Sequence, residues 1–181
     1  PEPMTPAMDQ TVRGRAITLH NAKNVYMKDV TVAYAPSWTI HPIYSRNLTF
    51  DNISVVSKGD GYTGAADDIC VLNGDGIDPD SSILVNIFNI NFLTGDDAVA
   101  IKSGRNKEGN DLDKPSAYIR ITDCVSDGSK GGFVAGSENA SGLRIHCSKI
   151  LPSKTLYFHT VYGLKPTGQE ADSVKIFCSG I

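Results

Sequence analysis

The feature that most constrains this chain is a short pattern of apolar residues that recurs six times. In each copy, apolar or small residues stand at relative positions 0, 2, 5 and 7, and successive copies begin 23 to 37 residues apart. The copies are Val25/Met27/Val30/Val32, Leu48/Phe50/Ile53/Val55, Val85/Ile87/Ile90/Phe92, Ile119/Ile121/Cys124/Ser126, Leu143/Ile145/Ser148/Ile150 and Val174/Ile176/Ser179/Ile181. A spacing of two is the period of a strand, and the step from 2 to 5 predicts a one-residue bend between two strands.

A strand pair once per repeat, with insertions of variable length between copies, is typical of a parallel β-solenoid whose coils stack on one another. A β-sandwich is the alternative, but it would show hairpin turns every ~8 to 12 residues. Asn73-Gly74 is the only Asn-Gly dipeptide, the strongest hairpin signal. We therefore expect an all-β parallel solenoid, with residues 1–181 forming a single domain. Because no end cap is visible, we expect these to be the central coils of a longer solenoid.

Composition and charge argue against several classes of function. A formal net charge of -3 and a pI near 5.8 argue against a general nucleic-acid binder, which normally carries a basic face. The sequence has no run of 18 apolar residues, so no membrane span is expected, and its first residues do not resemble a signal peptide. The four cysteines form no CxxC pair, which disfavours a zinc site, and we expect them to be buried free thiols.

Two acidic clusters carry the chemistry. One lies within residues 73–78, the other is Asp96-Asp97, and they are separated by one repeat. Neighbouring coils stack ~4.8 Å apart, so three carboxylates converge if both clusters occupy the same side of the solenoid. Such a site suits inverting glycoside hydrolysis, in which crowding raises one pKa and supplies the acid. A turn or calcium loop is the structural alternative, although the EF-hand pattern fails because Leu84 stands where glutamate is required.

The residues around these clusters resemble glycoside hydrolase family 28, the polygalacturonases and their relatives. Residues 73–81, Asn-Gly-Asp-Gly-Ile-Asp-Pro-Asp-Ser, are similar to that family's Asn-Thr-Asp-Gly-Ile-Asp-Pro-Asp-Ser segment. Residues 94–104 resemble its Gly-Asp-Asp-(Cys/Ala)-Ile-Ala-Ile-Lys-Ser-Gly segment, and residues 38–42 and 131–138 are similar to bacterial members. The resemblance implies a right-handed parallel β-helix, and a hydrolase that cleaves α-linked galacturonides in pectin with inversion.

The resemblance also implies roles for individual residues. Asp96 would protonate the glycosidic oxygen, while Asp75 and Asp97 would activate the attacking water. Four further residues are expected to bind the anionic polysaccharide: Asn73, Lys102, Lys130 and Lys165. No metal or cofactor is implied, and we expect a secreted or periplasmic monomer with neither nucleic-acid nor membrane partners.

Two motifs depart from the family. Its Gly-His-Gly is Ser129-Lys130-Gly131 here, which puts a fixed cation beside the aspartates and would depress their pKa values. Its Gly-(Leu/Ile)-Arg-Ile-Lys aligns only with residues 163–167, which contain Lys165 but no arginine. These departures leave two alternatives open: a rhamnogalacturonan hydrolase or other α-glycosidase of the same fold, and a non-catalytic solenoid that binds polysaccharide.

Overall fold

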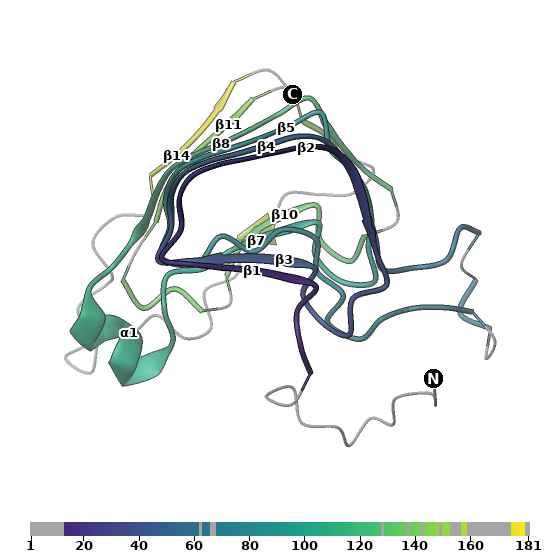
Figure 1. The fold of residues 1–181 in the computed structure, drawn as a ribbon, viewed down its shortest axis with the longest axis horizontal. Coiled ribbons are helices and arrows are strands. Elements are labelled where there is room, and N and C mark those ends of the chain that lie inside the picture. The colour runs from purple at the N-terminus through teal and green to yellow at the C-terminus, as the bar shows by residue number, and fades with distance from the viewer. Residues whose placement is uncertain are drawn as a thin grey trace.

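The computed structural model describes residues 13–61, 63–65, 68–127, 129–136, 138–141, 143–148, 150–152, 157–158 and 175–179. Their strands pair in parallel and wind into stacked coils, so the fold is a parallel β-helix (Figure 1). The first face of the coils carries β1 (Ile17–His20), β3 (Ile40–Ile43), β7 (Val99–Ile101), β10 (Phe133–Ala135) and β13 (Tyr157–Phe158). Single bridges from Ile77 and Asp80 join β3 to β7 and complete that face.

The other strands form a second, continuous sheet, and those labelled in Figure 1 lie on the far side of the cross-section. They are β2 (Lys23–Ala33), β4 (Arg46–Val56), β5 (Ile83–Phe88), β6 (Asn91–Leu93), β8 (Ser116–Thr122), β9 (Cys124–Ser126), β11 (Leu143–Ser148), β12 (Ile150–Pro152) and β14 (Lys175–Ser179). One short helix, α1 (Asn106–Leu112), completes the described elements. Within the described residues, no helix has the length and apolar character that a membrane crossing needs.

The predicted bend falls at one residue per coil. Asp29, Asn52, Asn89 and Asp123 lie between relative positions 2 and 5, and all four have left-handed backbones with φ between 51° and 57°. Aspartate and asparagine tolerate this conformation better than other residues with a side chain. Asn52 Nδ2 donates to Asp29 Oδ1 at 2.7 Å, so two successive bends are also bonded to each other. The one-residue bend predicted from the spacing is confirmed.

The register confirms the first four repeats and corrects the alignment of the fifth repeat on the fourth. Val25 pairs with Leu48, Leu48 with Val85, and Val85 with Ile119, as predicted. Ile119 then pairs with Ile145 instead of Leu143, whereas Ile145 pairs with Ile176, as the alignment of the last two repeats predicts. A shift of two residues keeps the same side chains on the same face of a strand, so an alternating pattern cannot separate these two registers.

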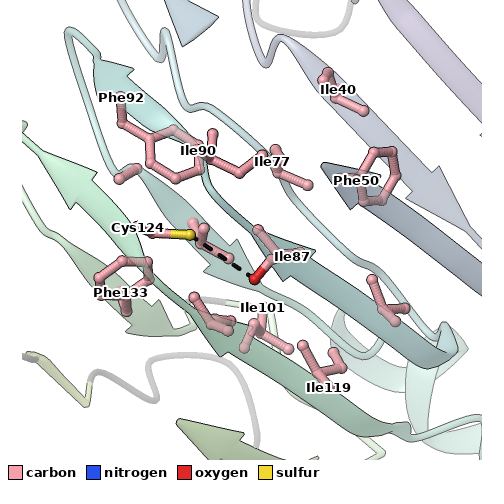
Figure 2. Close-up of a cluster of buried hydrophobic side chains, with 14 of the residues drawn as sticks. Ile40, Phe50, Ile77, Ile87, Ile90, Phe92, Ile101, Ile119, Cys124 and Phe133 are labelled. Atoms are coloured by element: carbon pink, nitrogen blue, oxygen red, sulfur yellow. Dashed lines mark hydrogen bonds between the residues drawn. The ribbon is translucent and has the colours of Figure 1, made fainter. Parts of the chain in front are cut away.

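The core fills the inside of the coils (Figure 2). Phe50, Ile77, Ile87 and Phe92 come from four segments of different coils or faces and are at most 2% exposed. Cys124 lies in the same core, its thiol 3.8 Å from the Ile87 carbonyl, and burial raises its pKa to about 12. Cys70, by contrast, is exposed, so the expectation that every cysteine is buried was wrong for that residue.

Buried serines tie the corner between two faces. The backbone N–H of Ala22 donates to the Ser45 hydroxyl at 2.9 Å, and that of Ser45 donates to the Ser82 hydroxyl at 3.1 Å. The N–H of Ser82 in turn donates to the hydroxyl of Ser116 at 3.1 Å. Each coil therefore satisfies a buried backbone donor of its neighbour, which a dry corner requires.

Candidate active site

Asp75 and Asp97 occupy the same position on consecutive coils. The N–H of Gly76 donates to the carbonyl of Asp97 at 2.9 Å, and the N–H of Ile77 donates to that of Ala98 at 3.0 Å. Both aspartates lie two residues before a bridged pair, Ile77 and Val99, on the first face. The two acidic clusters are therefore one coil apart on the same side of the helix, as the sequence predicts.

The backbone of Asp96 is held by the coil beyond it. Its carbonyl accepts the N–H of Lys130 at 3.1 Å and the hydroxyl of Thr94 at 2.9 Å. Thr94 is fully buried, and its hydroxyl lies 2.6 Å from that of Ser129. The carboxylate itself is 16% exposed and lies 3.7 Å from the ammonium of Lys130. Asp96 is thus fixed through its backbone while its side chain reaches solvent.

Glycines flank the aspartates because there is no room for a side chain. A Cβ at Gly131 would lie 2.5 Å from the Asp97 carboxylate and 2.6 Å from Val134. A Cβ at Gly76 would meet the Ala98 carbonyl oxygen and the ring of Phe92. Glycine at both positions allows the coils to approach closely around the carboxylates.

Burial and mutual repulsion keep protons on this cluster. The pKa of Asp75 is raised to about 7, chiefly by burial and further by Asp96 and Asp97, although Lys102 opposes the rise. The pKa of Asp97 is raised to about 6 by burial and by Asp96, with Lys102 and Lys130 acting in the opposite direction. Lys130 therefore favours ionisation as expected, but burial outweighs it and the net shift of Asp97 is upward.

The raised pKa values fall on Asp75 and Asp97, the pair assigned to the attacking water. Crowding was expected to raise one pKa and so to supply the acid. Two members of the trio are raised instead, and each can be neutral near pH 6. The acid role of Asp96 consequently rests on its motif and its accessibility.

Asp78 is a fourth acidic group at the site, one that the motif contains but to which no catalytic role was assigned. It is fully buried, and neither of its carboxyl oxygens has a hydrogen-bond partner in the described structure. Burial first, and then Asp75, raise its pKa well above the ordinary value. The signal in the sequence was its spacing of three from Asp75, for which a turn or calcium loop was kept as the structural alternative.

Lys102 balances these carboxyl groups from beneath. Its side chain is 5% exposed, and its ammonium lies 3.0 Å from Glu138 and 4.5 Å from the centre of the Trp38 ring. Burial lowers its pKa, but this effect is outweighed by the nearby carboxylates of Asp78, Glu138 and Asp75, which raise the pKa. The net shift is upward, so the ammonium stays charged. This lysine is buried against protein groups, and its binding of substrate remains a prediction.

The other predicted ligands are placed differently. Asn73 accepts a hydrogen bond from the Arg13 guanidinium at 2.7 Å and adopts a left-handed backbone with φ of 52°, so part of its role is structural. Lys130 projects into solvent with a 75% exposed side chain. Lys165 lies outside the described residues. Among the residues that the structure describes, no group of three His, Cys, Asp or Glu side chains is arranged to hold a metal ion.

Comparisons with known proteins agree with this geometry. The family model for glycosyl hydrolases family 28 matches residues 5–150. A probable polygalacturonase of Vitis vinifera is 31% identical over 130 residues, which is 71% of this chain and 24% of that protein. A hyperthermoactive exopolygalacturonase from Thermotoga maritima superposes with a TM-score of 0.70 at 31% identity, over 81% of this chain and 32% of that one. The chain therefore spans between a quarter and a third of the length of these relatives.

Proposed function

Because the chain belongs to family 28 of the glycosyl hydrolases, we propose that it cleaves α-linked galacturonides of pectin with inversion at the anomeric carbon. The observation that carries this proposal is the stacking of Asp75 on Asp97, which gathers three carboxylates of unequal burial on one face. Inverting hydrolysis needs one carboxylic acid at the leaving oxygen and one carboxylate behind a water molecule.

The roles follow from exposure and charge. We assign proton donation to the glycosidic oxygen to Asp96 from its motif, and its 16% exposed side chain can meet a substrate that arrives from solvent. The pKa of Asp97 is raised to about 6 and that of Asp75 to about 7, so between these values the pair holds a carboxylate that can accept a proton from water. Lys102 supports the ionised state from below because its ammonium is buried beside the trio.

A substrate with alternating uronate and neutral sugars is the second candidate. It is favoured by Lys130, which stands where the family has histidine and lies 3.7 Å from Asp96. Release of reducing ends from polygalacturonate and from rhamnogalacturonan, measured side by side on the full-length protein, separates the two candidates. Activity on neither polymer would contradict both.

The test of the site is the substitution Asp96→Asn. We expect kcat on the preferred polymer to fall by about 10²- to 10⁴-fold, as for loss of a general acid, while the affinity for the polymer is retained. Asp111→Asn is the control, because Asp111 is 60% exposed on α1 and should leave turnover unchanged. Unchanged turnover in the Asp96 variant would remove Asp96 from the acid role. A wild type that binds the polymer but shows no turnover would favour the non-catalytic, polysaccharide-binding solenoid. The anomer released by the wild type, followed by NMR, tests inversion.

A further inference from the structure

The position occupied by Asp75 and Asp97 continues toward the N-terminus through two more coils. Trp38 stands two residues before Ile40, and Arg15 two residues before Ile17. Ile17 pairs with Ile40, and Ile40 with Ile77, so Arg15, Trp38, Asp75 and Asp97 form one column along the helix. With coils ~4.8 Å apart, Arg15 lies ~10 Å along the axis from the level of Asp75. That offset places it beside a sugar other than the one whose bond would be cleaved.

Arg15 is held in place, yet part of its guanidinium is unused. Its guanidinium carbon lies 4.5 Å from the centre of the Trp38 ring, a cation–π contact. Nη1 donates to the Arg13 carbonyl at 3.0 Å, whereas Nε is buried and has no hydrogen-bond partner in the described structure. Among the described residues, no carboxylate lies within ion-pair distance of Arg15.

The neighbouring arginine shows what a structural guanidinium looks like in the same segment. Arg13 is 6% exposed and donates to the carbonyls of Leu72 and Pro36 and to Asn73 Oδ1. These contacts fix the turn that leads into the Asp75 motif. Arg15 makes no comparable set of bonds to the chain, although it is only two residues away.

The column also sets the distribution of charge along the first face. The buried cation, Lys102, is paired with Glu138. The acidic trio is then flanked by one cation on each side: Lys130, on the coil after Asp96, and Arg15, two coils before Asp75. A polyanion lying along the column meets a positive group on either side of the acidic centre, which offsets the repulsion between its carboxylates and the aspartates.

We propose that Arg15, held by Trp38, binds the carboxylate of a uronate residue outside the bond that is cleaved. The guanidinium presents planar N–H donors that match a carboxylate, and its contact with the indole ring fixes its plane. This inference rests on the proposed function, since it takes the ligand of the face to be a polyuronide. It assigns to the first coils a selectivity for charge that the acidic trio alone does not provide.

Binding measurements on the full-length protein test this assignment. The reference protein carries Asp96→Asn alone, which suppresses cleavage, and Arg15→Gln, Arg15→Lys and Arg120→Gln are each added to it. Tetragalacturonate and its fully methyl-esterified counterpart are titrated calorimetrically into these four proteins. Arg120 is exposed on β8, on the far side of the cross-section, and provides the matched control. We expect Arg15→Gln to weaken the binding of tetragalacturonate about 10-fold, which corresponds to the loss of one charge-assisted hydrogen bond, and to leave the affinity for the ester unchanged. Arg15→Lys should recover part of the loss.

Each outcome of this titration either supports or overturns the assignment of Arg15 to uronate binding. Equal affinity of Arg15→Gln and the control for tetragalacturonate overturns the proposal, as does an equal loss for the acid and the ester, which would mark a structural role. Absence of any tetragalacturonate binding overturns it as well. Hydrolysis of polygalacturonate by the wild type is assayed in parallel. If the wild type is inert but Arg15→Gln loses affinity for the acid alone, the proposed function fails while the uronate contact stands.

Discussion

Two columns of residues run along this helix, and they differ in what each coil contributes. At the bend between the two halves of β2, β4 and their successors, the first four coils supply Asp or Asn in the same left-handed conformation. At the column before the first face, successive coils supply Arg15, Trp38, Asp75, Asp97 and Gly131. The repeat is kept where it shapes the coil and abandoned where substrate is expected. Positions in the first column should therefore affect stability, and positions in the second should affect chemistry.

The largest effect that separates catalysis from stability is expected from Asp75→Asn. Because Asp75 would serve the water, kcat should fall by about 10²- to 10⁴-fold. Stability should change in the opposite direction. The pKa of Asp75 is raised in the folded state, so its contribution to stability is fully present below pH ~4 and is lost as the pH rises to about 7.

Asparagine cannot ionise, so the variant should escape that loss and gain about 2 to 4 kcal/mol relative to the wild type between pH 4 and pH 8. Guanidinium unfolding at pH 4, 5.5, 7 and 8, together with turnover assays, measures both effects. Parallel stability curves for the two proteins would mean that Asp75 is already ionised in the fold.

Substitutions in the hydrophobic core are expected to change the free energy of unfolding by a similar amount and to leave turnover unchanged. Ile87 is fully buried in the core, and Ile87→Ala should cost about 2 to 5 kcal/mol of unfolding free energy. Val125→Ala removes methyl groups from a side chain that is 44% exposed and should cost less than about 0.5 kcal/mol. Chemical denaturation gives both values. A changed kcat in the folded Ile87 variant would show that core and site are not separable.

The bend column should respond to backbone conformation more than to side-chain chemistry. Asn52 has a φ of 51°, and alanine there should cost about 1 kcal/mol because its Cβ disfavours the left-handed region. Glycine at the same position has no such penalty and should lose only the bond to Asp29. Thermal unfolding ranks the three proteins. If glycine proves worse than alanine, the side-chain ladder matters more than the bend.

The smallest effect belongs to Lys130→Gln. Lys130 lowers the pKa of Asp97, so its removal should raise that pKa and move the acidic limb of the pH–rate profile upward by a few tenths of a unit. Because the side chain is 75% exposed, added salt should reduce the difference between variant and wild type. The exposed Lys23 gives a matched control as Lys23→Gln. A downward movement of the limb would contradict the assignment of Asp97 to the water.

The sequence predicted the coil, its bend and the meeting of Asp75 with Asp97, because each depends on local periodicity and on the distance between coils. It failed at the pairing of Ile119 with Ile145, where two alignments bury the same face. It also missed the burial of Asp78 and the partnership of Lys102 with Glu138, 36 residues apart, since side-chain depth depends on how the corners fold. Cys70 was misjudged for a similar reason: it lies in an insertion, outside the repeat that predicts burial.

That insertion, residues 57–71, leaves the coil and returns to almost the same point. The N–H of Gly59 donates to Ile69, and the N–H of Val71 donates to the carbonyl of Ser57, which closes its base. The coils on either side are thus joined independently of what lies between these anchors, and the free-energy cost of a longer loop grows only slowly with its length. The segment beside Gly95 can accordingly be shortened, extended or exchanged as one contiguous stretch without changing how the coils stack.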